Sequence, residues 1–320
     1  MYTRNATSQI QELEWSIAYH KEMLEQPDRW FTAQVPGAVQ LDIMKGENYA
    51  QPWWYGDNFR QFDWMESWYF TYKTNFKKPS LKRGEQLFFF SKGIDYQFQI
   101  YLNNQKIWEQ EGMFRYVDID ITNYLETENE LKIIVMPIPS IGVPYEKGKD
   151  TYRQNARESV KPAVSYGWDW HPRLVTRGIW DETGLIVRNK SRLSDVKVDY
   201  NLNATLTSAN VFLEVNGVEI AGKEIKWVLT DPTGKRIVEK LISLQENECI
   251  IHQSLPEICL WWPNGYGSAS LYTSDLYLLD QNNEILEQQT KKIGFRKVRL
   301  VMNEKLREEL RQAREEHTRE

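Results

Sequence analysis

The sequence predicts an all-β protein built from two domains. A chain of 320 residues is long enough for about two domains of ordinary size, and 41% apolar with 27% charged residues is the balance of a globular protein. Over most of the chain, apolar residues recur at every second position, which is the period of a β-strand. Ten of the 13 tryptophans precede Gly184. This uneven distribution indicates that the two domains have different roles.

The first half opens with an exception to the strand period. A short helix is predicted there from four apolar residues at roughly helical spacing, Ile10, Leu13, Ile17 and Leu24. The segment 68–76 then alternates strictly, so its aromatic side chains share one face of a half-buried strand. Further strands are predicted at 96–102, 106–108, 113–121 and 131–136. Asn103-Asn104 tolerates positive φ, and a hairpin is therefore expected at this dipeptide.

The second half predicts a regular sandwich. Strand patterns separated by turn signals occur at 196–202, 211–215, 225–229, 237–244, 249–255, 271–279 and 285–293. About seven strands in roughly a hundred residues is the count of an immunoglobulin-like sandwich. The domain boundary is expected near Asn189 to Ser194, which gives domains at 1–190 and 191–302. The last segment, 303–320, has 11 charged residues in 18 and predicts a solvated helix, a tail or a linker, or alternatively a helix that binds a partner.

Composition and charge exclude several classes of partner. The formal net charge is −5, so no overall basic field attracts nucleic acid or anionic lipid. No apolar run reaches the ~18 residues of a membrane span. Two cysteines and four scattered histidines give no metal motif, and no cofactor fingerprint occurs. The start of the chain is polar and lacks the layout of a secretion signal, so we expect a cytoplasmic protein.

The densest candidate site lies at the end of a long loop between Pro137 and Pro172. There Asp169 stands between two indoles, in the order Trp168, Asp169, Trp170. The C–H faces of a pyranose pack on aromatic rings and its hydroxyls donate to carboxylates, so this triplet is a minimal sugar contact. The alternative is that the tryptophans belong to the core and Asp169 caps a turn. Three basic residues upstream offer further donors or are solvated charges: Arg153, Arg157 and Lys161.

No catalytic centre is recognisable in this chain. The 45 acidic residues include many pairs by chance, and sequence spacing in a β protein does not show whether two carboxyl groups lie ~5 Å apart, as retaining glycoside chemistry requires. Nucleophile elbows, phosphate loops and dinucleotide fingerprints are absent from the sequence. We therefore assign no catalytic residue.

Four stretches together resemble the N-terminal part of glycoside hydrolase family 2, closest to its β-mannosidase branch. They are Val35-Pro36-Gly37-Ala38-Val39-Gln40-Leu41-Asp42, Tyr166-Gly167-Trp168-Asp169-Trp170-His171-Pro172 with Arg177-Gly178-Ile179-Trp180, Leu260-Trp261-Trp262-Pro263-Asn264-Gly265-Tyr266-Gly267, and Ile293-Gly294-Phe295-Arg296. Their order and spacing are specific, and they span most of residues 35–301.

The resemblance implies a jelly-roll, galactose-binding-like domain, then an immunoglobulin-like sandwich, and then a (β/α)8 barrel with both catalytic glutamates. Such a barrel needs ~250 residues, and only about two dozen follow the Gly294-Phe295-Arg296 motif. The segment 303–320 would then be a linker towards a barrel absent from this sequence. In the family the acid/base glutamate follows an asparagine. None of the Asn-Glu pairs here would lie in a barrel strand, so none inherits that role.

By the same resemblance, Asp169 would accept hydrogen bonds from sugar hydroxyls, and Trp168 and Trp170 would wall the pocket for the non-reducing-end sugar. His171 replaces the glycine that the family usually has, and its larger side chain would narrow the subsite or change the epimer that fits. Trp261-Trp262-Pro263 is interpreted as sandwich core or as packing against the next domain.

The expected function is therefore the non-catalytic part of a retaining exo-β-glycosidase acting on terminal β-linked sugars of oligosaccharides, most closely a β-mannosidase. The parent polypeptide would be the enzyme, with an oligosaccharide substrate, and this chain alone would be inactive. The alternatives are a β-galactosidase or β-glucuronidase part, a free-standing carbohydrate-binding module, or a purely structural scaffold.

Overall fold

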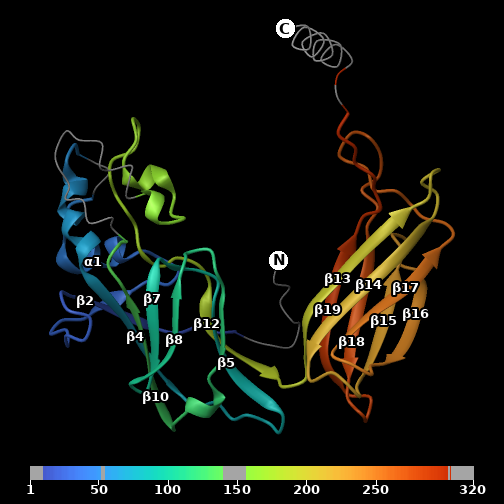
Figure 1. Ribbon diagram of the computed structural model, residues 1–320, viewed down its shortest axis with the longest axis horizontal. Helices are drawn as coiled ribbons and strands as arrows, with labels where there is room; N and C mark the ends of the chain where they lie inside the picture. The colour runs from blue at the N-terminus through green and yellow to red at the C-terminus, as the bar shows by residue number, and fades with distance from the viewer. Residues whose placement is uncertain (1–9, 52–54, 140–155, 302, 304–320) are drawn as a thin grey trace, which may run out of the picture. The chain divides into compact units, whose positions relative to one another are not determined.

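The computed structural model describes residues 10–51, 55–139, 156–301 and 303 (Figure 1). Regular structure in these residues is nearly all β, which confirms the predicted class. Contacts divide the chain into two compact units, a first unit spanning Ser8–Lys190 and a second unit that contains the residues from Ser191 onward.

The first unit is a jelly-roll-like sandwich of two antiparallel sheets. The larger sheet has the order β3-β2-β4-β10-β7-β8 and the smaller one β1-β12-β5-β9 (Figure 1). The larger sheet comprises β2 (Trp15–His20), β3 (Phe31–Ala33), β4 (Tyr69–Lys77), β7 (Gln97–Leu102), β8 (Gln105–Glu111) and β10 (Glu128–Val135). The smaller comprises β1 (Ile10–Gln11), β5 (Glu85–Ser91), β9 (Val117–Asp120) and β12 (Thr183–Asn189). A separate short pair joins β6 (Ile94–Asp95) to β11 (Gly178–Ile179).

Apolar side chains of both sheets meet in one core. The alternation predicted for the segment 68–76 is present in β4, where Phe70 and Tyr72 are fully buried. They belong to the same cluster as Leu87 and Phe89 of β5. Burying a side chain of this size contributes about 1.5–3 kcal/mol. Packing of these side chains from the two sheets therefore stabilises the first unit.

The predicted opening helix is wrong, because this part of the chain contains strand β2. Strand β2 pairs with β3 and β4, and side chains on both of its faces are covered. Ile17 and Ala18 are both fully buried although they point to opposite faces. The chain does form an α-helix later, α1 (Val39–Glu47). Short 3₁₀ turns complete the described helical structure: η1 (Asn58–Ser67), η2 (Thr122–Tyr124), η3 (Ala156–Glu158) and η4 (Ala163–Tyr166).

The predicted hairpin at Asn103-Asn104 is confirmed. These residues join β7 to β8 and have φ of 51° and 65°. Asparagine tolerates this left-handed region better than most residues. The Asn103 carboxamide also accepts a hydrogen bond from the backbone N–H of Glu130 at 3.0 Å. Side chain and backbone therefore fix the same turn.

The second unit is a seven-stranded, immunoglobulin-like sandwich. One sheet has the order β13-β14-β17 and the other β16-β15-β18-β19. The strands are β13 (Arg192–Leu202), β14 (Ala209–Val218), β15 (Glu224–Thr230), β16 (Arg236–Ser243), β17 (Glu248–Leu255), β18 (Tyr272–Leu279) and β19 (Ile285–Ile293). Trp227 is fully buried, and its indole N–H donates to the Ser274 hydroxyl at 2.9 Å. Both the class and the strand number agree with the alternation in the sequence.

The end of β19 is fastened to the sandwich by Tyr200. Its hydroxyl donates to the carbonyl of Gly294 at 2.9 Å and accepts the N–H of Arg296 at 3.0 Å. Phe295, the residue between these two, is fully buried. The centre of its ring lies 4.9 Å from that of the Tyr200 ring and 4.8 Å from that of the Tyr272 ring. The charged segment 303–320 falls outside the described residues except for Asn303. Within the described part, no helix combines the length and the apolar character that crossing a membrane requires.

Candidate functional site

The predicted sugar contact lies at the tip of a small hairpin-like loop in the first unit. Trp168 and His171 exchange two backbone hydrogen bonds, at 2.9 Å and 3.2 Å, which places Asp169 and Trp170 in the turn. Below them, the N–H of Leu174 donates to the carbonyl of Ser165 at 2.9 Å. The backbone of this loop is therefore closed on itself.

The side chains of the turn face solvent. Trp168 is 46% exposed and Trp170 is 74% exposed, so neither ring belongs to the core. Asp169 is exposed as well, and no described residue donates a hydrogen bond or forms an ion pair with its carboxylate. The His171 ring lies perpendicular to the Trp170 ring at 6.1 Å, and its Nδ1 is 2.6 Å from the Pro172 carbonyl. The turn thus presents two apolar surfaces and a solvated acceptor.

A salt bridge and a buried tyrosine support the base of this loop. The Arg173 guanidinium donates to both carboxylate oxygens of Glu66 at 2.9 Å and 2.6 Å. It also lies over the ring of Tyr166, which is fully buried. Because the fork of an arginine fits a carboxylate in two places at once, this pair orients the loop as well as anchoring it.

Lys161 is the second anchor, and it is unavailable to a sugar. Its ammonium forms an ion pair with Asp95 of β6 in which the two side chains are 1% and 3% exposed, and it donates to the Thr176 carbonyl at 2.7 Å. Burial lowers the pKa of Lys161 and raises that of Asp95. Of the other two upstream bases, Arg157 is exposed and Arg153 lies outside the described residues. The sequence showed the charge of Lys161 but not its partner 66 residues away.

Arg177 completes the support from within the core. Its guanidinium donates to the carbonyl of Trp68 at 2.9 Å and to those of Met65 and Met136. Burial lowers its pKa to about 10, so it stays charged. Next to it, the φ of Gly178 is +125°, and a Cβ there would lie 2.5 Å from the Tyr72 hydroxyl. The Arg-Gly pair of the sequence motif is therefore structural.

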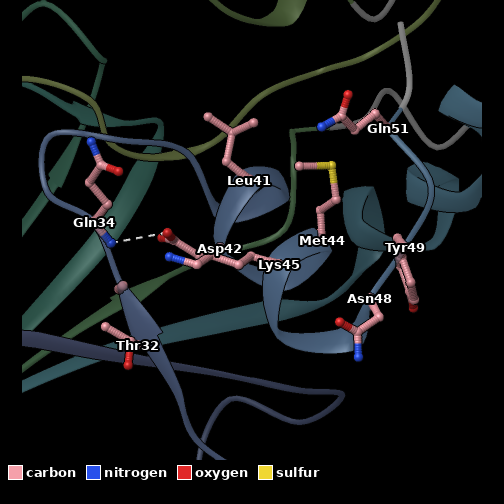
Figure 2. A pocket seen from close by; sticks show the side chains of 10 residues that line it. Thr32, Gln34, Leu41, Asp42, Met44, Lys45, Asn48, Tyr49 and Gln51 are labelled. Atoms are coloured by element: carbon pink, nitrogen blue, oxygen red, sulfur yellow. Dashed lines mark hydrogen bonds between the residues drawn. The ribbon is translucent and has the colours of Figure 1, made fainter. Parts of the chain in front are cut away.

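A pocket of about 520 Å³ opens elsewhere in the first unit, between β3 and α1 (Figure 2). None of its lining residues belongs to the 168–171 turn. Asp42, 5% exposed, lies at its wall, and its Oδ1 accepts the backbone N–H of Gln34 at 3.0 Å. Its Oδ2 is buried without a hydrogen bond from any described residue. The sequence motif contained Asp42, but no pattern marked it as a binding residue.

The pKa of Asp42 is unusually high for an aspartate. Burial raises its pKa to about 6, against opposing contributions from the Gln34 N–H and from Lys45. Burial, and secondarily the nearby charge of Asp42, raises the pKa of Tyr72 on β4. Among the described residues, the hydrogen bond from the Gln34 N–H to Oδ1 does not compensate for the burial of an ionised Asp42, whose Oδ2 has no donor.

The aromatic motif of the second unit is not core. Trp262 is 45% exposed, and Trp261 is half-buried with the Arg296 guanidinium 4.8 Å from its ring centre. The interpretation of these residues as sandwich core is therefore wrong, and their packing against a further domain stays a prediction. Gly294 and Gly267 explain part of the motif, because a Cβ at either position would contact a tryptophan at under 3.0 Å. Across the described residues of both units, no group of three or more potential metal ligands occurs.

Comparison with known proteins gives a consistent result. The family model for the glycosyl hydrolase 2 galactose-binding-like domain matches residues 15–181, and that for glycosyl hydrolases family 2 matches residues 191–296. β-Mannosidase B of Aspergillus clavatus is 27% identical over 304 residues, covering 90% of this chain and 35% of the relative. β-Mannosidase B of Aspergillus niger is 29% identical over 279 residues, which cover 83% of this chain and 33% of the relative.

Solved structures agree with these relatives. A β-D-mannosidase from Dictyoglomus thermophilum is similar with a TM-score of 0.72 at 28% identity, covering 92% of this chain and 36% of that one. A β-glucuronidase from an uncultured Clostridium has a TM-score of 0.60 at 17% identity, covering 94% and 47%, which shows likeness of fold alone. The chain spans about a third of the length of the curated relatives it matches.

Removing the buried anchor should destabilise the first unit. Lys161→Met leaves the Asp95 carboxylate buried without its partner, so the free energy of unfolding should fall by roughly 3 kcal/mol or more. Urea titration monitored by tryptophan fluorescence measures the change. Lys106→Met is the matched control, because the Lys106–Glu109 pair is 48% and 49% exposed and should contribute under about 1 kcal/mol. Equal losses in the two variants would contradict this account of the anchor.

Asp42 should make stability depend on pH. Its pKa is raised from 3.8 to about 6, so its favourable contribution is complete below pH 3.8 and is lost as pH rises through about 6. Between pH 4 and pH 7, Asp42→Asn should gain up to roughly 3 kcal/mol relative to the native chain, because the asparagine does not titrate. Urea unfolding of both proteins at the two pH values measures this difference.

The sign of that effect has an internal control in the second unit. The Thr233 hydroxyl and nearby backbone amides lower the pKa of the exposed Asp231. Because this carboxyl is ionised in both the folded and the unfolded protein over most of the range from pH 4 to pH 7, Asp231→Asn should show little pH dependence there. Its opposite effect, a stabilising contribution of native Asp231 that is lost on acidification, should appear below about pH 3.8. A difference between Asp42→Asn and the native chain that stays constant with pH would refute the raised pKa.

Proposed function

The chain belongs to glycoside hydrolase family 2, and from this membership we propose that it is the non-catalytic N-terminal part of a retaining exo-β-glycosidase, most closely a β-mannosidase. The relatives that it matches over most of its length at 27–29% identity are named β-mannosidases, and it spans about a third of them. In this proposal the catalytic acids belong to a barrel outside these 320 residues. The cytoplasmic location stays a prediction.

The exposed 168–171 turn carries the functional part of the proposal. Two indoles and a carboxylate that accepts no hydrogen bond from the described residues project from a loop whose base is fixed by ion pairs. The rings would pack on the C–H faces of a terminal pyranose, and Asp169 would accept hydrogen bonds from its hydroxyls. One turn encloses a sugar on one side only. Further polypeptide would have to supply the rest of the pocket and the bond-breaking groups.

The rigid base suits this role. A group that orients a substrate must be held within a fraction of an ångström, and a loop alone rarely does so. Here the Arg173–Glu66 pair and the Lys161–Asp95 pair constrain the loop on both sides of the turn. The backbone that carries the exposed rings is therefore anchored on both sides of the turn.

The chain alone should be inactive. With p-nitrophenyl β-mannoside or β-galactoside, it should release no nitrophenol above buffer, because the proposal gives it no acid/base and nucleophile pair. Absorbance of nitrophenolate measures the rate. Turnover that survives repurification and disappears on substituting an acid of this chain would refute the non-catalytic assignment.

In the polypeptide that joins these domains to the barrel, Asp169→Ala should lower kcat/KM for the β-mannoside. Loss of hydrogen bonds to a charged acceptor predicts roughly a 10- to 100-fold decrease. Asp57→Ala is a control, because Asp57 is 80% exposed and contacts only Arg60 at 3.5 Å among the ion pairs described. An unchanged kcat/KM in Asp169→Ala would instead support a scaffold role. Saturable sugar binding by the isolated chain that Asp169→Ala abolishes would indicate a complete carbohydrate-binding module.

A further inference from the structure

We propose that the pocket between β3 and α1 is a second saccharide-binding site, one that takes a neutral pyranose or a similar polyhydroxylated molecule. The pocket lies in the same unit as the 168–171 turn, yet it shares no residue with it. Its volume of about 520 Å³ falls within the range of small-molecule sites and leaves room for a hexose.

The chemistry of the lining favours hydroxyl groups. Three carboxamides border the pocket, those of Gln34, Asn48 and Gln51. Each carboxamide has both a donor and an acceptor, as each sugar hydroxyl does, so the two kinds of group pair in either direction. The Tyr49 ring and apolar side chains of α1 add surface for the C–H face of a pyranose. Figure 2 shows Gln34 on the segment before α1, and Asn48 and Gln51 on the segment after it.

The charges of the pocket favour a neutral ligand. Among its lining residues Asp42 and Lys45 carry opposite charges, and in Figure 2 the Lys45 side chain extends towards Asp42. Each of these charges attracts one sign of ion and repels the other, so together they give neither an anion nor a cation a net advantage. Tyr72 of β4, a further titratable group close to Asp42, stays neutral because burial raises its pKa. A polyol meets neither repulsion.

Asp42 also offers a charged acceptor to a hydroxyl in the pocket. Its Oδ1 accepts the Gln34 N–H at 3.0 Å, and a carboxylate oxygen has a further lone pair for a second hydrogen bond. Its Oδ2 is buried without a hydrogen bond from the described residues and lies out of reach of a ligand, so the acceptor in this proposal is Oδ1.

Amide-resolved NMR titration of the chain with methyl β-D-mannopyranoside tests this proposal. Backbone amides of α1 and of Asn48 and Tyr49 should shift saturably. Choline and inorganic phosphate, as cationic and anionic probes, should leave them unmoved. Asp42→Asn should weaken binding roughly tenfold or more, because it removes the charged acceptor.

A second pair of variants distinguishes a loss of binding from a loss of folding. Asn48→Gly keeps the left-handed backbone at φ 57° and removes one carboxamide, and binding should weaken roughly three- to tenfold. Asn104→Gly is the matched control, because Asn104 has φ 65° in the β7–β8 turn and is absent from the pocket lining. It should bind like the native chain.

The possible results separate this site from the proposed function. Saturable shifts at α1 that Asn48→Gly weakens and Asn104→Gly does not would support the inference. Shifts confined to 168–171, shifts at α1 with phosphate or choline instead, or no saturable shift with any probe would overturn it. Shifts confined to 168–171 would also favour the carbohydrate-binding module as the function of this chain. The other outcomes leave the kcat/KM of Asp169→Ala in the larger enzyme undecided, so either proposal can fail without the other.

Discussion

Charge buried beneath an exposed turn is the constraint on which the candidate site depends. Lys161 and Asp95 are almost inaccessible as a pair, and Arg177 directs its guanidinium to backbone carbonyls inside the same unit. Apolar residues in place of a buried ion pair are often equally stable, but removal of one partner leaves an unpaired charge that is costly. Any other placement of the loop would separate these charges. The loop is therefore held in one position although its tip has little contact with the core.

The strands were predictable because their side chains repeat with a period of two, and the Asn103-Asn104 turn because asparagine tolerates positive φ. The opening strand was not. Ile17 and Ala18 are both buried, on opposite faces of β2, so the alternation between apolar and polar residues that marks a half-buried strand is missing there. Four apolar residues then matched a helical spacing by chance. Pairing with β3 and β4 determines the structure of this segment, and the local sequence pattern does not reveal that pairing.

The site was predictable only where chemistry is local. An acid between two indoles is visible in sequence, and the structure places all three side chains in solvent. The roles of Lys161 and Asp42 were not visible, because each depends on distant residues. Lys161 becomes an anchor through Asp95, and Asp42 acquires its raised pKa through burial against β3 and β4. The exposure of Trp262 was missed for the same reason, since an aromatic residue in a sandwich sequence is usually buried.

Asp169 and Asp42 are carboxylates in two different environments, and each is proposed to accept a hydrogen bond from a sugar hydroxyl. Asp169 is exposed and solvated, so a ligand must replace water there, and the gain becomes large only if other groups exclude solvent from the contact. Such a turn works best when further polypeptide covers it. Asp42 is already enclosed, with one oxygen that no described residue satisfies. That oxygen is out of reach, so a hydroxyl in the pocket would instead add a second hydrogen bond to Oδ1, beside that of the Gln34 N–H. The residues around this pocket all belong to the first unit. The first unit could therefore hold one sugar by itself while it contributes only one side of the pocket for another.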